Sequence, residues 1–201
     1  MSEESSFDVD ALREQVKDKY REVATTPGAE FHFHTGSPLA ARCGYAQSDY
    51  EHLPNSAVES FAGVANPFAL REVEAGETVV DLGSGAGFDC FIAAKKVGEG
   101  GRVIGVDMTE EMLDKARSLS SALGLSQVVF QEGYIEDIPL GDEEADVVMC
   151  NGVFNLCPDK RKVFAEIFRV LKPGGYLQFA DIANSKPVPQ SAVDDIDLWT
   201  A

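Results

Sequence analysis

The sequence is poor in basic residues and in long apolar runs, and each shortage excludes a class of protein. Lysine and arginine number 17 against 34 aspartates and glutamates, so the net charge is −17. Nucleic-acid binding needs clustered Lys and Arg, and we therefore expect no nucleic-acid partner. No apolar run approaches the roughly 20 residues that span a bilayer, and the N-terminal MSEESSFDVD lacks a signal-peptide pattern. We expect a cytoplasmic protein without a membrane partner.

Cysteine and histidine are also scarce. The four cysteines contain no C-x-x-C pair: Cys43, Cys90, Cys150 and Cys157. In a cytosolic chain such thiols are expected to be reduced. His32 and His34 alternate with phenylalanine and would share one side of an extended segment. Zinc needs three or four converging ligands, so we predict a loop with aromatic packing and no metal site.

The most informative feature is a glycine-rich turn between an apolar run and the expected start of a helix. Residues 79–89 read VVDLGSGAGFD, and Asp107 ends the next apolar run. Such glycines let backbone N–H groups approach a ligand, and an acid about twenty residues further on accepts hydrogen bonds from ribose hydroxyls. The alternative is a tight turn that binds no ligand. Three glycines within five residues, followed by Asp107 at the end of the next apolar run, argue against that alternative. The pattern indicates a site for a nucleoside-bearing cofactor.

The glycine spacing narrows the cofactor. Dinucleotide sites favour G-x-G-x-x-G, whose third glycine would fall at position 88, where this chain has phenylalanine. The glycines are instead Gly83, Gly85 and Gly87. G-x-G-x-G after a strand favours S-adenosylmethionine, because its amino-acid end lies over the loop without a pyrophosphate to hold. A dinucleotide-dependent oxidoreductase is therefore a distant alternative.

Strand and helix patterns alternate in the second two thirds of the chain. Strands are predicted at 78–82, 102–107, 127–131, 145–150 and 176–182, and helices at 88–97, 109–123 and 159–171. Lys172-Pro173-Gly174-Gly175 should form the turn after the third of these helices. This alternation implies right-handed crossovers and an α/β fold, a doubly wound, Rossmann-like parallel sheet.

The domain organisation follows from these patterns. We predict an N-terminal helix with an irregular cap over 1–67, a cofactor-binding core over 68–184 and a C-terminal tail over 185–201. The helix should cover 8–24, because apolar residues recur there on one face. Short helical turns are expected at 39–42 and 57–62.

Several segments together resemble the S-adenosylmethionine-dependent arsenite methyltransferases: VVDLGSGAGFDC, VIGVDMTEEML, EGYIEDIPL, NGVFNLCPDKRKVF and RVLKPGGYLQFADI. The resemblance covers roughly residues 66 to 183, with a weaker similarity of VKDKYREVA to the family's N-terminal helix. It implies the class I methyltransferase fold, which continues after the fifth strand with a helix and an antiparallel strand pair. Only residues 183–201 remain here. We expect a truncated form without the C-terminal strands, the alternative being a sheet edge covered by a partner subunit in a homo-oligomer.

The resemblance also implies roles for individual residues. The loop under the methionine part of the cofactor consists of Gly83, Ser84, Gly85 and Gly87. Asp81 orients that loop, and Asp107 binds the ribose hydroxyls.

At the other positions that match, Met108 packs on the adenine, and Ile135 and Glu136 meet its edge. Asn151 lies near the sulfonium, and Tyr20 closes over the cofactor. The alternatives are plain packing for Met108 and Tyr20 and a solvated loop acid for Glu136.

In the family, thiolates hold arsenic(III), which is soft and thiophilic, beside the methyl group. Where the family reads SNCVINL, this chain reads CNGVFNL, so Gly152 takes the place of one arsenic-binding cysteine. Cys150 lies two positions earlier and Cys157 five later, and Cys43 could stand in for an N-terminal family cysteine. These three are the candidate catalytic residues. The attack of the arsenic lone pair on the methyl carbon needs alignment more than a general base.

The resulting prediction is an S-adenosylmethionine-dependent methyltransferase that acts on a small molecule and resembles arsenite methyltransferases. One alternative keeps the fold and changes the acceptor to a carbon, oxygen or nitrogen nucleophile of a small metabolite, which Gly152 allows. Another is a cofactor-binding fragment without activity.

Overall fold

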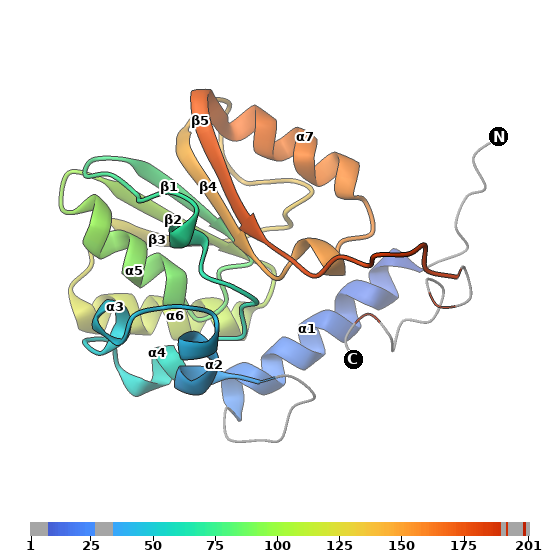
Figure 1. The fold of residues 1–201 in the computed structure, drawn as a ribbon, viewed down its shortest axis with the longest axis horizontal. Coiled ribbons are helices and arrows are strands. Elements are labelled where there is room, and N and C mark those ends of the chain that lie inside the picture. The colour runs from blue at the N-terminus through green and yellow to red at the C-terminus, as the bar shows by residue number, and fades with distance from the viewer. Residues whose placement is uncertain (1–7, 27–33, 190–191, 193–198, 200–201) are drawn as a thin grey trace.

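The protein forms a five-stranded parallel sheet with helices on both faces (Figure 1). The structure is a computed structural model that describes residues 8–26, 34–189, 192 and 199. The strand order is β3-β2-β1-β4-β5. The strands are β1 (Thr78–Leu82), β2 (Arg102–Asp107), β3 (Val128–Glu132), β4 (Ala145–Asn151) and β5 (Leu171–Ala180). The order reverses between β1 and β4, and ligands of such sheets bind outside the carboxyl ends of the strands at that point.

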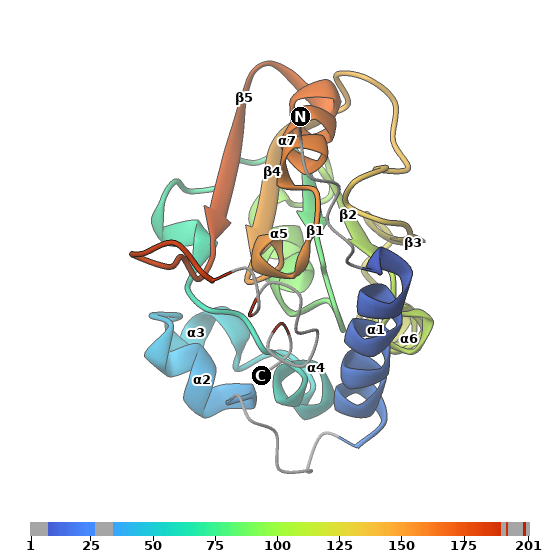
Figure 2. The same cartoon turned by 90° about the vertical axis from the view of Figure 1, so that its right-hand side faces the viewer.

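The helices divide into three that cover the sheet and several that lie near its carboxyl edge. The sheet helices are α5 (Phe88–Val97), α6 (Glu110–Leu123) and α7 (Lys160–Val170), with α5 and α6 on one face and α7 on the other (Figure 1). Figure 2 shows α1 beside α6, below the carboxyl ends of the strands. The remaining helical segments are α1 (Val9–Thr25), α2 (Gly36–Arg42), α3 (Gln47–Tyr50), α4 (Asn55–Glu59), η1 (Pro67–Ala69) and η2 (Phe154–Leu156).

The strands are apolar on both sides because both faces of the sheet are covered. Val79 and Val147 belong to the core under α5 and α6, whereas the next residues, Val80 and Val148, belong to the core under α7. Consecutive side chains of a strand point to opposite faces, and this alternation produces two separate cores. The same rule places Cys150 on the α7 face of β4.

Side-chain caps and left-handed glycines set the limits of the helices. The Asp8 carboxylate accepts from the backbone N–H groups of Asp10 and Ala11 at the start of α1, at 3.1 and 3.0 Å. Asp159 accepts in the same way from Lys162 at the start of α7. Gly124 ends α6 with a φ of 68°, a conformation that glycine adopts without a steric penalty.

The predicted α/β architecture is confirmed, and β1, β2 and α5 have the predicted limits. The prediction for β5 was wrong at both ends. Leu171 already pairs with Ala145, and the next pair is Tyr176 with Val147, so residues 172–175 bulge out of the strand instead of preceding it. The lysine, proline and two glycines therefore interrupt the pairing of β5 with β4, but β5 begins before them, at Leu171.

β5 is an edge strand of the sheet in the described part of the chain. Within the described residues no strand follows β5, so β5 pairs with β4 alone. Among those same residues no helix is long and apolar enough to cross a membrane. His32 and most of residues 190–201 lie outside the described part of the chain. The division of the chain into segments 1–67, 68–184 and 185–201 remains a prediction.

Candidate cofactor site

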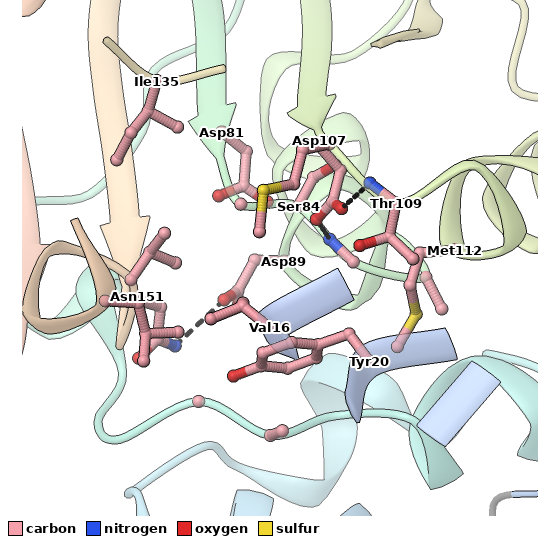
Figure 3. Close-up of a pocket in the computed structure, with 18 of the residues that line it drawn as sticks. Val16, Tyr20, Asp81, Ser84, Asp89, Asp107, Thr109, Met112, Ile135 and Asn151 are labelled. Atoms are coloured by element: carbon pink, nitrogen blue, oxygen red, sulfur yellow. Dashed lines mark hydrogen bonds between the residues drawn. The ribbon is translucent and has the colours of Figure 1, made fainter. Parts of the chain in front are cut away.

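A pocket lies at the carboxyl ends of β1, β2 and β4, with α1 along one side (Figure 3). Almost all the predicted cofactor residues line it: Tyr20, Asp81, Gly83, Ser84, Gly85, Asp107, Met108, Ile135, Glu136 and Asn151. The exception is Gly87. The structure therefore brings together residues from five separate segments of the sequence at one cavity.

Asp107 at the end of β2 holds the glycine loop in place. One carboxylate oxygen, Oδ2, accepts from the backbone N–H of Gly85 at 2.9 Å, and Oδ1 accepts from that of Thr109 at 2.8 Å. Burial raises the pKa of Asp107, and the backbone N–H groups oppose that rise. Each oxygen keeps acceptor capacity for a further donor, as binding to ribose hydroxyls would require.

The loop leaves space on its pocket side and contains a buried donor without a partner. A Cβ on Gly85 would meet only the Met112 sulfur, at 4.0 Å. The hydroxyl of Ser84 is buried and has no hydrogen-bond partner among the described residues. A buried polar atom without a partner costs free energy unless a ligand satisfies it. The residues of the loop thus fit a cofactor with polar groups at this point.

Gly87 shapes the turn from outside the pocket. Its φ is 89°, and a Cβ there would lie 2.8 Å from ring atoms of both Phe91 and Phe130. It is also the N-cap residue of α5. The third glycine of the motif is therefore required by the backbone and by packing.

Two carboxylates lie side by side beneath the loop. Asp81 on β1 and Asp89 on α5 are both buried and both line the pocket. Burial raises the pKa of Asp89 to about 6, although two hydrogen bonds to it act in the opposite direction. Burial and the neighbouring charge of Asp89 together raise the pKa of Asp81 well above its ordinary range.

Asp89 and Asn151 connect the sheet to the irregular cap segment. The Asp89 carboxylate accepts from the Tyr45 hydroxyl at 2.6 Å and from the Asn151 amide at 3.1 Å. The Asn151 amide oxygen in turn accepts from the backbone N–H groups of Val64 and Ala65 at 2.8 and 3.2 Å. The side chain at the end of β4 therefore fixes the chain that passes over it.

Phe88, which replaces the third glycine of a dinucleotide motif, also binds the cap. Its ring packs against those of Tyr45, Tyr50 and Phe61, with centroid separations of 5.2, 5.7 and 4.4 Å. Aromatic pairs at such distances add to the free energy of burial. Phe61 and its neighbours Ala62 and Gly63 line the pocket, so the cap contributes one of its walls.

The opposite wall contains an ion pair between α1 and the loop after β3. The Arg13 guanidinium lies 3.4 Å from a carboxylate oxygen of Glu136, whose side chain is only 7% exposed. Glu136 is thus a buried, paired acid, and the alternative of a solvated loop acid is wrong. Tyr20 lies further along α1, and burial raises the pKa of its hydroxyl to about 12.

The three candidate cysteines do not meet at the pocket. Cys157 lines it, and burial raises the pKa of that thiol to about 12. Cys150 is fully buried in the α7 core, and Cys43 packs at the edge of the core on the other face. Among the described residues no three His, Cys, Asp or Glu side chains are arranged to hold a metal ion.

Two residues at the site were not predicted from the sequence. Arg13 and Asp89 both line the pocket and were not among the predicted site residues. Asp89 ends the GSGAGFD motif, and its position in the first turn of the helix after the loop was the available signal. Arg13 had no signal, because its partner Glu136 is 123 residues away in the sequence.

Comparisons with known proteins agree with this geometry. A family model described as a methyltransferase domain matches residues 73–200. The chain therefore belongs to the methyltransferase-domain family. The prediction of a class I fold with S-adenosylmethionine as the cofactor is confirmed.

Within this family the chain is similar to arsenite methyltransferases, as predicted. The one from Halobacterium salinarum is 38% identical over an aligned length of 207 positions, and the alignment covers 96% of this chain and 53% of that protein. The human one is 38% identical over 130 residues, 60% of this chain and 35% of that protein. The crystal structure of an arsenic(III) S-adenosylmethionine methyltransferase from Chlamydomonas reinhardtii superposes with a TM-score of 0.67 at 38% identity, covering 73% of this chain and 51% of that one.

The chain spans about half the length of these relatives. A methyltransferase from Aquifex aeolicus, with a TM-score of 0.53 at 25% identity, covers 92% of this chain and 80% of that one. The described sheet is thus shared with enzymes of different size.

Proposed function

We propose that the protein transfers a methyl group from S-adenosylmethionine to a small molecule, with arsenite as the first candidate acceptor. The observation that supports this most is the pocket in which Asp107 and the Gly85 backbone, Ser84 and the acids Asp81 and Asp89 line one cavity. When bound there, S-adenosylmethionine would supply an electrophilic methyl group on a sulfonium.

The residues of the chain would bind and orient the two reactants. We assign the ribose to Asp107, the methionine part to the loop of Gly83, Ser84 and Gly85 with Asp81 beneath it, and the adenine to Met108, Ile135 and Glu136. Tyr20 on α1 would cover the cofactor. The acceptor would approach from Asn151, Val153 and Cys157, at the end of β4. As the new bond to the methyl carbon forms, the bond from carbon to sulfur breaks and its electron pair remains on sulfur.

Arsenite is favoured by the similarity to proteins named arsenite methyltransferases. Cys157 is the thiol that lines the pocket, and we propose that it contacts the acceptor. Cys150 and Cys43 would need a rearrangement of the chain to reach the same ion. A carbon, oxygen or nitrogen nucleophile is the second candidate, because Gly152 stands where a family cysteine is expected and a single candidate thiol faces the pocket.

Calorimetric titration with S-adenosylmethionine and S-adenosylhomocysteine, with NAD as the control, tests the cofactor. We expect both adenosyl compounds to bind and NAD not to bind. Binding of NAD alone would overturn the assignment, and binding of none would favour the fragment without a complete site.

The acceptor is tested by arsenite titration and methylation assays of Cys157→Ser, Cys150→Ser and Cys43→Ser. Capture by Cys157 predicts that the first variant loses arsenite binding. Arsenite binding that survives all three substitutions contradicts thiolate capture.

We further propose a cytoplasmic location and no nucleic-acid or membrane partner, supported by the net charge of −17. The edge of β5 is the candidate surface for a homo-oligomer, because within the described part of the chain β5 pairs with β4 alone and its side chains Tyr176 and Phe179 are exposed. Light scattering over a range of concentrations tests this surface. A monomer at every concentration contradicts it.

A further inference from the structure

The pocket has an excess of negative charge. Asp81, Asp89, Asp107 and Glu136 line it, and Arg13 is the single basic residue of the lining within the described chain. Because Arg13 is paired with Glu136, the other three carboxylates of the lining have no cationic partner among the residues that the structure describes. The unpartnered, buried hydroxyl of Ser84 beside them independently indicates that a ligand completes this site. The excess of carboxylates points to a ligand that carries positive charge.

The acids are arranged along the pocket, and Asp107 fixes the direction in which a nucleoside cofactor would lie. The ribose belongs at Asp107, at the end of β2. The rest of the ligand must then extend across the loop toward the ends of β1 and β4. Figure 3 shows Asp81, Asp89 and Asn151 around that part of the space, with Tyr20 below them in the view.

Asp89 differs from Asp81 in its position relative to the acceptor side. Asp81 lies under the loop, and one of its oxygens accepts from the Cys90 thiol at 3.3 Å. Asp89 is bonded to Asn151, beyond which the pocket continues to Val153 and Cys157. For transfer the methyl group would have to face that side, which would bring the sulfur that bears it nearer to Asp89.

We propose that Asp89 is the counter-ion of the cofactor sulfonium and lets the site distinguish S-adenosylmethionine from its demethylated product. This inference rests on the proposed function. S-adenosylmethionine carries one positive charge more than S-adenosylhomocysteine, and that charge is on the sulfur. Methyl transfer leaves a neutral thioether, so the attraction to Asp89 disappears and the product is released more readily.

The hydrogen bonds of Asp89 suit this role. Tyr45 donates to Oδ1 and Asn151 donates to Oδ2, and both bonds favour the charged form of the carboxylate. A carboxylate has about four lone-pair sites, so both oxygens can still interact with a cation. Tyr45 and Asn151 also prevent the side chain from turning away, which keeps its charge directed at the pocket.

Binding of a cation should release protons from this site. The titratable groups that face Asp89 are Asp81 on β1, Cys90 on α5, and Tyr45 and Cys43 in the cap. Burial raises the pKa of Asp89 to about 6, and a bound sulfonium would lower it again. The affinity for S-adenosylmethionine should therefore rise with pH through about 6, more steeply than that for S-adenosylhomocysteine.

The decisive experiment is calorimetric titration of the full chain and of Asp89→Asn with both adenosyl compounds. We expect Asp89→Asn to weaken binding of S-adenosylmethionine by about tenfold or more, as loss of a charge-assisted contact does. Binding of S-adenosylhomocysteine should change less than about threefold, because its sulfur is uncharged. Equal weakening of both compounds would overturn the inference. If the unchanged protein binds neither compound, the proposed function fails first.

Three further variants show whether the effect is specific to Asp89. Asp81→Asn and Asp107→Asn should weaken both compounds alike, because the ammonium and the ribose are common to them. Asp114→Asn removes a carboxylate on the exposed side of α6 and should change neither affinity.

Tyr45→Phe keeps the Asp89 charge and removes one donor, so it tests the inference even if Asp89→Asn does not fold. The pKa of Asp89 should rise in this variant, and the pH midpoint of S-adenosylmethionine binding should move upward with it. An unchanged midpoint would contradict the role of Asp89.

Discussion

The side-chain amide of Asn151 donates to the Asp89 carboxylate over 3.1 Å and so joins the end of β4 to the first turn of α5. The same amide donates to the backbone oxygen of Ala65 at 2.8 Å, and its oxygen accepts from Val64 and Ala65. One side chain thus satisfies backbone groups of the cap and holds an acid of the pocket. The position of the cap depends on the last residue of the fourth strand.

Replacement of Asn151 by alanine should detach the cap from the sheet. The backbone groups of Val64 and Ala65 would lose their partners, and we expect the free energy of unfolding to fall by about 2 kcal/mol. Chemical denaturation measures this change, and calorimetry should show weaker S-adenosylmethionine binding. Gln15→Ala on the exposed side of α1 is the matched control. Equal stability of the two variants would contradict the role of Asn151.

The extent to which this site could be predicted depends on the distance between its residues in the sequence. The limits of β1, α5 and β2 were predictable because apolar runs, glycines and Asp107 follow one another within thirty residues of chain. Residues 45 and 89 are 44 positions apart, and residues 89 and 151 are 62 apart. No local pattern reports such contacts, and the pairing of Tyr45, Asp89 and Asn151 required the folded structure.

The register of β5 was unpredictable for a different reason. Leu171 pairs with β4 before the lysine, proline and glycines of 172–175, which normally indicate a turn between elements. Here the sheet continues on both sides of that turn. The aromatic cluster around Phe88 was also unpredictable. Phe88 was informative about the cofactor, but its partners Tyr45 and Phe61 lie in a segment without periodicity, so their contacts with it could not be predicted.

Two glycines of the loop should respond differently to alanine. A Cβ on Gly83 would lie 2.3 Å from a methyl group of Val153, and its φ is 71°. Gly83→Ala should therefore lower the free energy of unfolding by about 2 to 3 kcal/mol. Gly85 has a φ of 51° but open space on the pocket side, so Gly85→Ala should cost about 1 kcal/mol.

Gly85→Ala should lose less stability than Gly83→Ala but more of its affinity for the cofactor. The new methyl group of Gly85→Ala would occupy the cavity itself, and calorimetry should show loss of S-adenosylmethionine binding in a protein that still folds. Denaturation curves supply the comparison with Gly83→Ala. A Gly85→Ala variant that binds the cofactor normally would mean that the loop does not approach it.

The ion pair between Arg13 on α1 and Glu136 in the loop after β3 should contribute more to stability than the more exposed ion pairs of α1. Arg13→Gln would leave Glu136, with a side chain 7% exposed, without its cationic partner. We expect a loss of about 1 to 2 kcal/mol in unfolding free energy and weaker binding of the adenosyl compounds. Arg21→Gln on the same helix removes a pair with the more exposed Glu111 and should lower the free energy of unfolding less than Arg13→Gln does. Similar losses in both variants would show that the pocket-side pair has no special weight.

Burial of Asp89 should make the stability of the cofactor-free protein depend on pH in an unusual direction for an acid. Its pKa is raised to about 6 in the folded protein, against roughly 3.9 in an unfolded chain. The folded state therefore holds this proton more tightly, and the resulting stabilisation is complete below pH 4 and lost as the pH rises through 6. Above that pH the fold contains a buried charge.

Asp89→Asn removes this titration and isolates its contribution. The free energy of unfolding of the variant, relative to the unchanged protein, should rise by about 2 kcal/mol between pH 4.5 and pH 7.5. Denaturation at both pH values in the absence of cofactor measures this difference, and Asp114→Asn, whose carboxylate is exposed, should show no such rise. A constant difference between the two pH values would mean that Asp89 is ionised throughout. Addition of S-adenosylmethionine at pH 7.5 should then reverse the ranking, because the bound cation stabilises the charge that the empty pocket disfavours.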